Sequence, residues 1–152
     1  MLVDDRIATD QPILAVGLRL TKAINFHNAI TPKALNRLEL LNAELVSYGL
    51  LPSGWDGEES VPADMAHIEA ATRALGVLPA GVPLPKPMLS ADGEVGLYWK
   101  NRDYLADIVI EDAHSLSLFI RSLKEGNKEI FIPSIAIGAD ATAAIAAAFK
   151  AV

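Results

Sequence analysis

The chain has 152 residues, of which 51% are hydrophobic and 21% are charged, and its formal net charge is −6. This length suits one domain with its own core, so we expect residues 1–152 to form a single domain. The acidic balance argues against duplex nucleic acid as a partner, because a DNA-binding surface needs clustered Lys and Arg. The lack of cysteine excludes disulfides, thiolate catalysis and Cys-based zinc sites.

The hydrophobic content is high for a soluble monomer and indicates either a dense core or apolar surface that is buried against another chain. We therefore expect a homo-oligomer or a protein partner. No stretch approaches the roughly 20 apolar residues of a membrane helix, and residues 1–10 lack the order of a secretory signal. These features predict a cytoplasmic protein that does not bind a membrane.

Residues 1–30 are interpreted as an arm that is either loosely attached or in contact with a neighbouring subunit. Within this arm, four apolar residues alternate with smaller or polar ones, which is typical of a strand: Leu14, Val16, Leu18 and Leu20. The residues that follow, Lys22 to Ile24, suit a helix equally well. The sequence therefore leaves residues 13–26 open between strand and helix.

Thr31 and Pro32 predict the start of a first helix, since Thr can cap a helix and Pro is tolerated at its first position. Apolar residues then recur at helical spacing: Leu35, Leu38, Leu41, Leu45 and Tyr48. Gly49 is expected as the C-cap.

A second helix is expected from Ser60 and Pro62 to Gly76. Its inner side is predicted from Met65, Ile68, Thr72 and Leu75. Residues 78–87 hold four prolines and therefore indicate an extended linker or an edge strand.

The second half of the chain alternates apolar and polar residues, which predicts strands at residues 94–100, 104–111, 115–122 and 129–132. Asp92-Gly93 is a typical hairpin signal, and Pro133 is expected to end the last strand. Short connections make neighbouring strands antiparallel. A closing helix from Asp140 to Ala151 is expected to cover one face. The fold class is therefore α+β: two N-terminal helices, a four-stranded antiparallel meander and a C-terminal helix packed on one face of the sheet.

An acidic turn, residues 51–62, separates the helical half from the β half. Its candidate binding residues are Trp55, Asp56, Glu58 and Glu59, and Asp64 follows close by. Carboxylates are the ligands of Mg²⁺ and Ca²⁺, so a small metal-dependent hydrolase acting on phosphodiesters is one alternative. The spacing matches no calcium loop, however, and carboxylates near a helix N-terminus are favourable without a metal. We predict no metal and no cofactor, with the Trp55 indole packing as an anchor between the two halves.

Four aromatic residues are candidates for the sheet face that no helix covers: Tyr98, Tyr104, Phe119 and Phe131. Aromatic rows on a sheet stack bases in single-stranded RNA binders, which is a second alternative. The basic-Gly-aromatic order of those proteins is missing and the charge is unfavourable. Aromatic residues are also enriched at the centres of protein interfaces, which favours a protein partner.

No catalytic constellation is evident in the sequence. The three histidines are far apart, and no nucleophile elbow or glycine-rich phosphate loop is present. We therefore predict no catalytic residues and incline towards a protein that is not an enzyme.

Trp55-Asp56-Gly57, Pro62 and the run from Asp92 to Trp99 resemble an uncharacterised bacterial protein family. Its members have a W-D-G turn, a Pro-rich link and a hairpin strand of the form D-G-x-φ-x-φ-x-W, where φ is apolar. The resemblance spans about residues 38–132 and implies a fold but no activity. The leading expectation is therefore a non-enzymatic interaction module that binds a protein partner or itself through the turn and the open sheet face.

Overall fold

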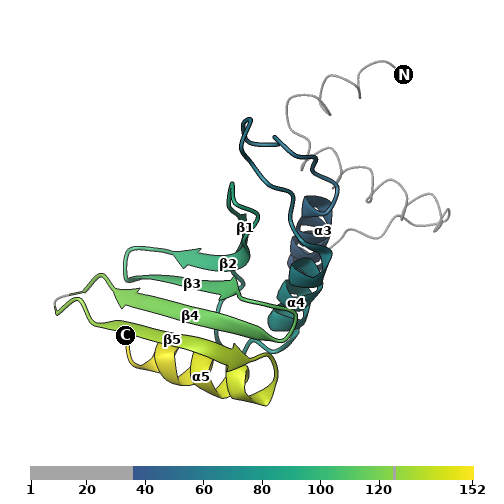
Figure 1. Cartoon of the computed structure of the whole chain (residues 1–152). Coiled ribbons are helices and arrows are strands. Elements are labelled where there is room, and N and C mark those ends of the chain that lie inside the picture. The colour runs from purple at the N-terminus through teal and green to yellow at the C-terminus, as the bar shows by residue number, and fades with distance from the viewer. Residues whose placement is uncertain (1–35, 125) are drawn as a thin grey trace.

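The computed structural model describes residues 36–124 and 126–152 (Figure 1). These residues form α3 (Arg37–Tyr48), α4 (Met65–Gly76), β1 (Lys86–Leu89), β2 (Val95–Lys100), β3 (Tyr104–Ile110), β4 (Ser115–Ser122), β5 (Glu129–Ala136) and α5 (Ala139–Lys150). The strands make one antiparallel sheet in the order β1-β2-β3-β4-β5. The predicted α+β class is confirmed, but the predicted count of four strands is wrong. None of the helices described is long and apolar enough to span a bilayer.

The additional strand comes from the end of the Pro-rich segment. β1 pairs with β2 so that Lys86 lies opposite Tyr98 and Leu89 lies opposite Val95. Pro87 is tolerated there because β1 is an edge strand. On its outer side there is no neighbouring strand whose carbonyl would need the missing N–H. Of the two predictions for residues 78–87, a linker or an edge strand, the edge strand is confirmed for the last two residues, Lys86 and Pro87.

The sequence predicted that the last strand ends at Pro133. This prediction is wrong, because β5 continues to Ala136. The register between β4 and β5 shifts between Leu116 and Leu118, and Ser134 beside the proline has a φ of +54°. A bulge on an edge strand absorbs the residue that cannot donate a hydrogen bond. Both edge strands thus carry a proline, Pro87 or Pro133, which disfavours the addition of another strand.

α3 begins at Arg37 because Asn36 caps it. The Asn36 side chain accepts a hydrogen bond from the Glu39 N–H at 2.9 Å, and Glu39 accepts one from the Asn36 N–H at 2.8 Å. The predicted start at Thr31, the arm of residues 1–30 and residues 13–26 lie outside the described residues.

Gly49 is the C-cap of α3, as predicted, but its φ of −68° is an ordinary helical value. Its conformation therefore does not require glycine. The position is crowded, however, because a Cβ there would lie 2.6 Å from the Met65 sulfur and 3.2 Å from Ile68 Cδ1, and these side chains would have to shift. The close approach of α3 to α4 explains this residue.

α4 begins at Met65, since the Asp64 side chain accepts a hydrogen bond from the Ala66 N–H at 2.7 Å. The expected start at Ser60 and Pro62 is wrong. Gly76 belongs to the helix, and Val77 is the C-cap. Ile68 and Leu75 are buried as predicted, whereas Met65 and Thr72 are exposed. The rest of the buried side is Ala70, Ala71 and Ala74. Small alanines let the helix approach the sheet closely.

α5 starts at Ala139 with Gly138 as the N-cap, so the expected cap Asp140 lies within the first turn. α5 packs on β4 and β5. The Thr142 hydroxyl donates to the Val77 carbonyl at 2.7 Å and so links α5 to the end of α4. The expectation that the C-terminal helix lies on one face of the sheet is confirmed.

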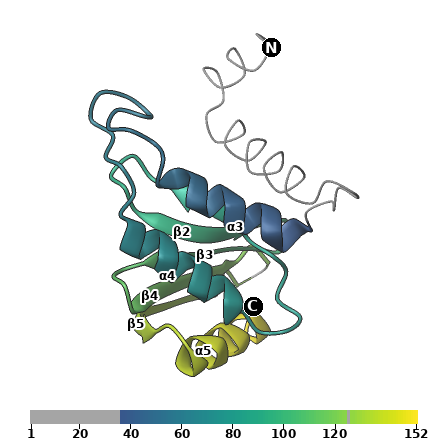
Figure 2. The ribbon, with the colours of Figure 1, turned by 90° about the vertical axis from the view of Figure 1, so that its right-hand side faces the viewer.

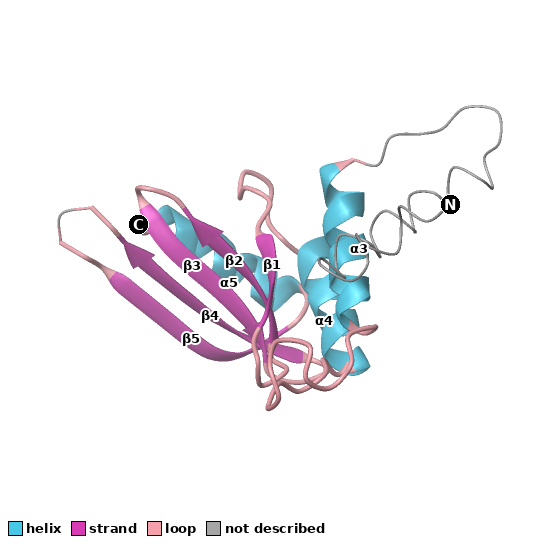
Figure 3. Cartoon of the chain, turned by 90° about the horizontal axis from the view of Figure 1, so that it is seen from above, coloured by secondary structure: helices cyan, strands magenta, loops and turns pink. Residues whose placement is uncertain are grey.

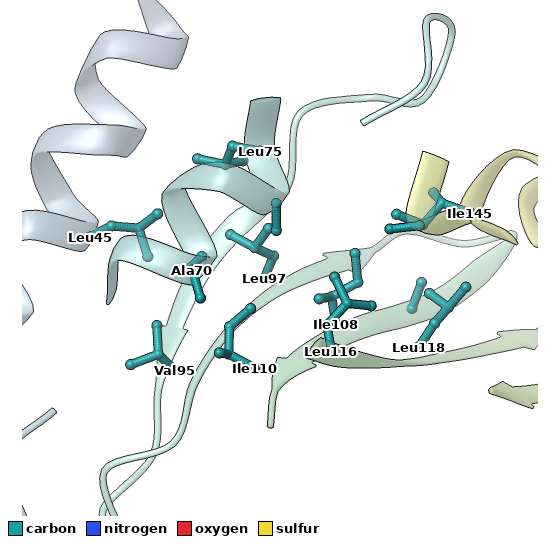
Figure 4. Close-up of a cluster of buried hydrophobic side chains, with 14 of the residues drawn as sticks. Leu45, Ala70, Leu75, Val95, Leu97, Ile108, Ile110, Leu116, Leu118 and Ile145 are labelled. Carbon is teal, nitrogen blue, oxygen red and sulfur yellow. The ribbon is translucent and has the colours of Figure 1, made fainter. Parts of the chain in front are cut away.

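The core lies between one face of the sheet and the helices. Figure 2 shows α3 and α4 side by side in front of the strands, with α5 below them. Figure 4 shows strand side chains such as Leu97, Ile108 and Leu118 pointing towards α4 and α5. These three side chains are fully buried. Burial of each such side chain contributes about 1.5–3 kcal/mol to folding.

We predict that Gly96→Ala destabilises the fold by about 1–3 kcal/mol, since a Cβ there would lie 2.5 Å from the backbone oxygen of Ile108. Urea unfolding measures the loss. Gly76→Ala is the matched control, because nothing lies within 4 Å of its Cβ position and its stability should be unchanged or slightly raised. Equal midpoints for both variants would contradict the tight contact of β2 with β3.

Candidate functional site

The acidic turn is closed by its own side chains. The Trp55 Nε1–H donates to the Val61 carbonyl at 3.0 Å. The buried Ser60 hydroxyl accepts from the Asp56 N–H at 2.9 Å and donates to the Gly57 carbonyl at 2.8 Å. Ser60, which the sequence assigned to a helix start, therefore holds the turn together.

The turn is also fastened to the β1–β2 hairpin. The Val61 N–H donates to the Ala91 carbonyl at 2.7 Å. Gly93 has a φ of +86°, and a Cβ there would lie 2.9 Å from the Pro62 oxygen. Trp55 is half-buried and packs against the core. These contacts agree with the expected role of Trp55 as an anchor between the helical half and the β half.

The carboxylates of the turn line an open depression of about 580 Å³ together with the tip of the hairpin. Its acidic residues are Asp56, Glu58, Glu59 and Asp92. A hydrogen bond from Ser90 holds the pKa of Asp92 below its usual value. Within the described part of the chain, no three His, Asp or Glu side chains are arranged to hold a metal ion. The hydrolase alternative therefore gains no support from the geometry of these residues.

We call the sheet surface opposite α4 and α5 the open face; Figure 3 views it with α5 behind the strands. Strand register arranges its side chains in four rows that cross the strands. The basic row is Lys100, Leu105, Arg121 and Glu129, and the aromatic row is Lys86, Tyr98, Asp107, Phe119 and Phe131. The small row is Met88, Gly96, Val109 and Ser117. The strand alternation continues into an acidic row of Glu94, Glu111 and Ser115.

Three of the four candidate aromatic residues meet in the aromatic row. Phe119 lies opposite Phe131, and Tyr98 is separated from Phe119 by Asp107 alone. Phe131 is 63% exposed, whereas Tyr98 and Phe119 are half-buried. An exposed Phe beside two partly covered aromatic rings is an apolar centre of the kind that contacts a partner.

Tyr104 does not join this row. It has the strand parity of Ala106 and Ile108, so it faces the helices, and its ring packs edge-on against Phe149 at 5.4 Å. Trp99 packs against the same ring at 5.2 Å and donates its Nε1–H to the Pro83 carbonyl at 2.7 Å. Tyr104 is therefore placed in the core layer and not on the candidate surface.

Sequence reasoning missed the charged residues of the open face. Lys86, Lys100 and Arg121 lie on three different strands, and only the register brings them to one end of the face. The alternation within β2 and β4 predicts that Lys100 and Arg121 lie on the outer side, but it gives no order across the strands. Lys86 lies in the Pro-rich segment, which was predicted only as a linker or an edge strand. Arg121 Nε lies 3.5 Å from a Glu129 carboxylate oxygen, an exposed pair that contributes little stability.

Comparisons with protein-family models, with curated proteins and with solved structures found no match to this chain.

Burial raises the pKa of Asp107 above its usual value. The folded state therefore binds this proton more tightly than the unfolded chain, and ionisation of Asp107 lowers stability as the pH rises from the unfolded pKa through the folded pKa. We predict that Asp107→Asn has a higher melting temperature than wild type at pH 7, and that this gain shrinks as the pH approaches about 4.

Thermal unfolding of dilute protein at the two pH values measures this difference. The exposed Asp103→Asn variant is the control and should show no such pH-dependent gain. A gain for Asp107→Asn that persists unchanged at low pH would assign the effect to packing instead of charge.

Proposed function

We propose that this protein is a non-enzymatic protein-interaction module that associates with a second copy of itself through the open face. The observation that carries the proposal is the aromatic row, in which Phe131 is exposed beside Phe119 on a face that α4 and α5 leave uncovered. In this proposal the acidic turn has a structural role, because its hydrogen bonds close the loop and attach it to the hairpin.

The sheet edges are poor alternatives to the face as a docking surface. β1 carries Pro87 and contacts α3, and β5 carries Pro133 at its bulge. Natural edge strands use prolines and bulges to prevent pairing with another chain. Association through the face also accounts for the high apolar content of the chain.

The RNA-binding alternative has one favourable feature, since Lys86 lies at the end of the aromatic row, and Lys100 and Arg121 lie in the neighbouring row. Asp107 in the middle of that row opposes it, because a carboxylate between two aromatic rings repels a phosphate backbone. We therefore rank a protein partner first.

We predict that Phe131→Ala weakens self-association at least tenfold and leaves unfolding stability within about 0.5 kcal/mol of wild type. The ring occurs twice in a symmetric dimer and lies in the contact, but it contributes little to the monomer core. Sedimentation velocity over a concentration series measures the association.

Leu50→Ala is the matched control, since Leu50 is 67% exposed and follows α3, away from the open face. It should associate like wild type. A wild-type protein that stays monomeric at every concentration would overturn the proposal, and so would equal weakening by both variants.

A further inference from the structure

We propose that the two copies stack open face on open face with the two-fold axis running across the strands, so that the basic row of each copy lies over the acidic row of the other. This inference rests on the proposed self-association and adds its orientation. It is carried by the order of the four rows along the strands and by the size of the side chains in each.

Charge changes sign from one end of the open face to the other. On β2, Lys100 lies in the basic row and Glu94 extends the strand into the acidic row, with Tyr98 and Gly96 between them. Glu111, which directly follows β3, also lies at the acidic end. The charge of the open face therefore changes from positive to negative along the strand direction. A second copy of the protein can stack on this face in one of two orientations.

A two-fold dimer of stacked sheets has its axis in the plane between them, either along the strands or across them. An axis along the strands places acidic row over acidic row and basic row over basic row. An axis across the strands exchanges the ends, so that Lys100 of one copy approaches Glu94 of the other, twice by symmetry. Like charges brought together oppose association, which selects the second arrangement.

The turns beyond the face reinforce this choice. Basic side chains outnumber the carboxylates of Asp103 and Glu129 at the end with the β2–β3 and β4–β5 turns: Lys86, Lys100, Arg102, Arg121, Lys124 and Lys128. The opposite end gathers carboxylates from the acidic turn and the hairpin tips: Asp56, Glu58, Glu59, Asp92, Glu111 and Asp112. Figure 1 shows the first group of turns and the C-terminus on the side away from α3 and α4.

Side-chain size fits the same axis. When the ends exchange, the aromatic row of one copy lies over the small row of the other. Phe119 then faces Ser117 of the second copy, and Tyr98 faces the Met88 side chain that lies over the buried Gly96. A large side chain seated on a small one lets two stacked sheets interdigitate, whereas the alternative axis lays the aromatic row of one copy over the aromatic row of the other.

Exchange of the charges tests the orientation. Lys100→Glu alone and Glu94→Lys alone should each weaken dimerisation at least tenfold, because each places like charges together twice. The double variant Lys100→Glu/Glu94→Lys should return to within about threefold of wild type. Both residues are exposed, so the monomer should fold normally in every case. Failure of the double variant to recover would overturn the proposed pairing.

Cross-linking separates the orientation from the self-association itself. The chain contains no cysteine, so single introduced thiols react without background. Leu105→Cys lies in the basic row, and Ser115→Cys lies in the acidic row one strand away. A short bismaleimide should join a mixture of the two variants efficiently and should join neither variant to itself.

Preferential cross-linking of Leu105→Cys to itself would show that a dimer exists with its axis along the strands, which overturns the orientation but leaves the proposed function intact. A protein that sediments as a monomer and gives no cross-link would overturn both.

Discussion

The burial of one sheet face under α4 and α5 is the constraint on which the rest of the structure depends. Successive strand residues point to opposite sides, so the side chains that fill the core also fix which side chains remain outside. Leu97, Ile108 and Leu118 are fully buried, and this places Tyr98, Asp107 and Phe119 together on the open face. Packing on one side thus builds the candidate surface on the other.

The acidic turn shows how a conspicuous motif can serve the fold. Its carboxylates suggest ion binding, but three other groups of the turn make internal hydrogen bonds. The indole N–H closes the loop, the Ser60 hydroxyl bridges it, and the Val61 N–H binds the hairpin. The indole packs on the core while its ring nitrogen reaches a carbonyl, as expected of an amphipathic side chain at a junction. The acids surround this junction and remain solvated.

Local signals predicted the existence of most elements but not their limits. Apolar spacing predicted α3, α4 and four of the five strands, and the Asp92-Gly93 turn lies where it was expected. The errors occurred where a tertiary neighbour outweighs a local preference. Pro133 stays in β5 because an edge position and a bulge tolerate it, and Ser60 serves the turn because Asp64 is available as a cap.

The sequence by itself determined the fold class, the inner and outer side of β2, β3 and β4, and the lack of any thiol chemistry, because these follow from periodicity and composition. Only the tertiary structure decided that Phe131 joins Phe119, that Tyr104 turns to Phe149, and that lysines far apart in the chain collect at one end of the face. The physical reason is strand register. Alternation along one strand gives the side on which a residue lies, but its neighbours on that side are set by hydrogen bonding to other strands and by the core that holds them in place.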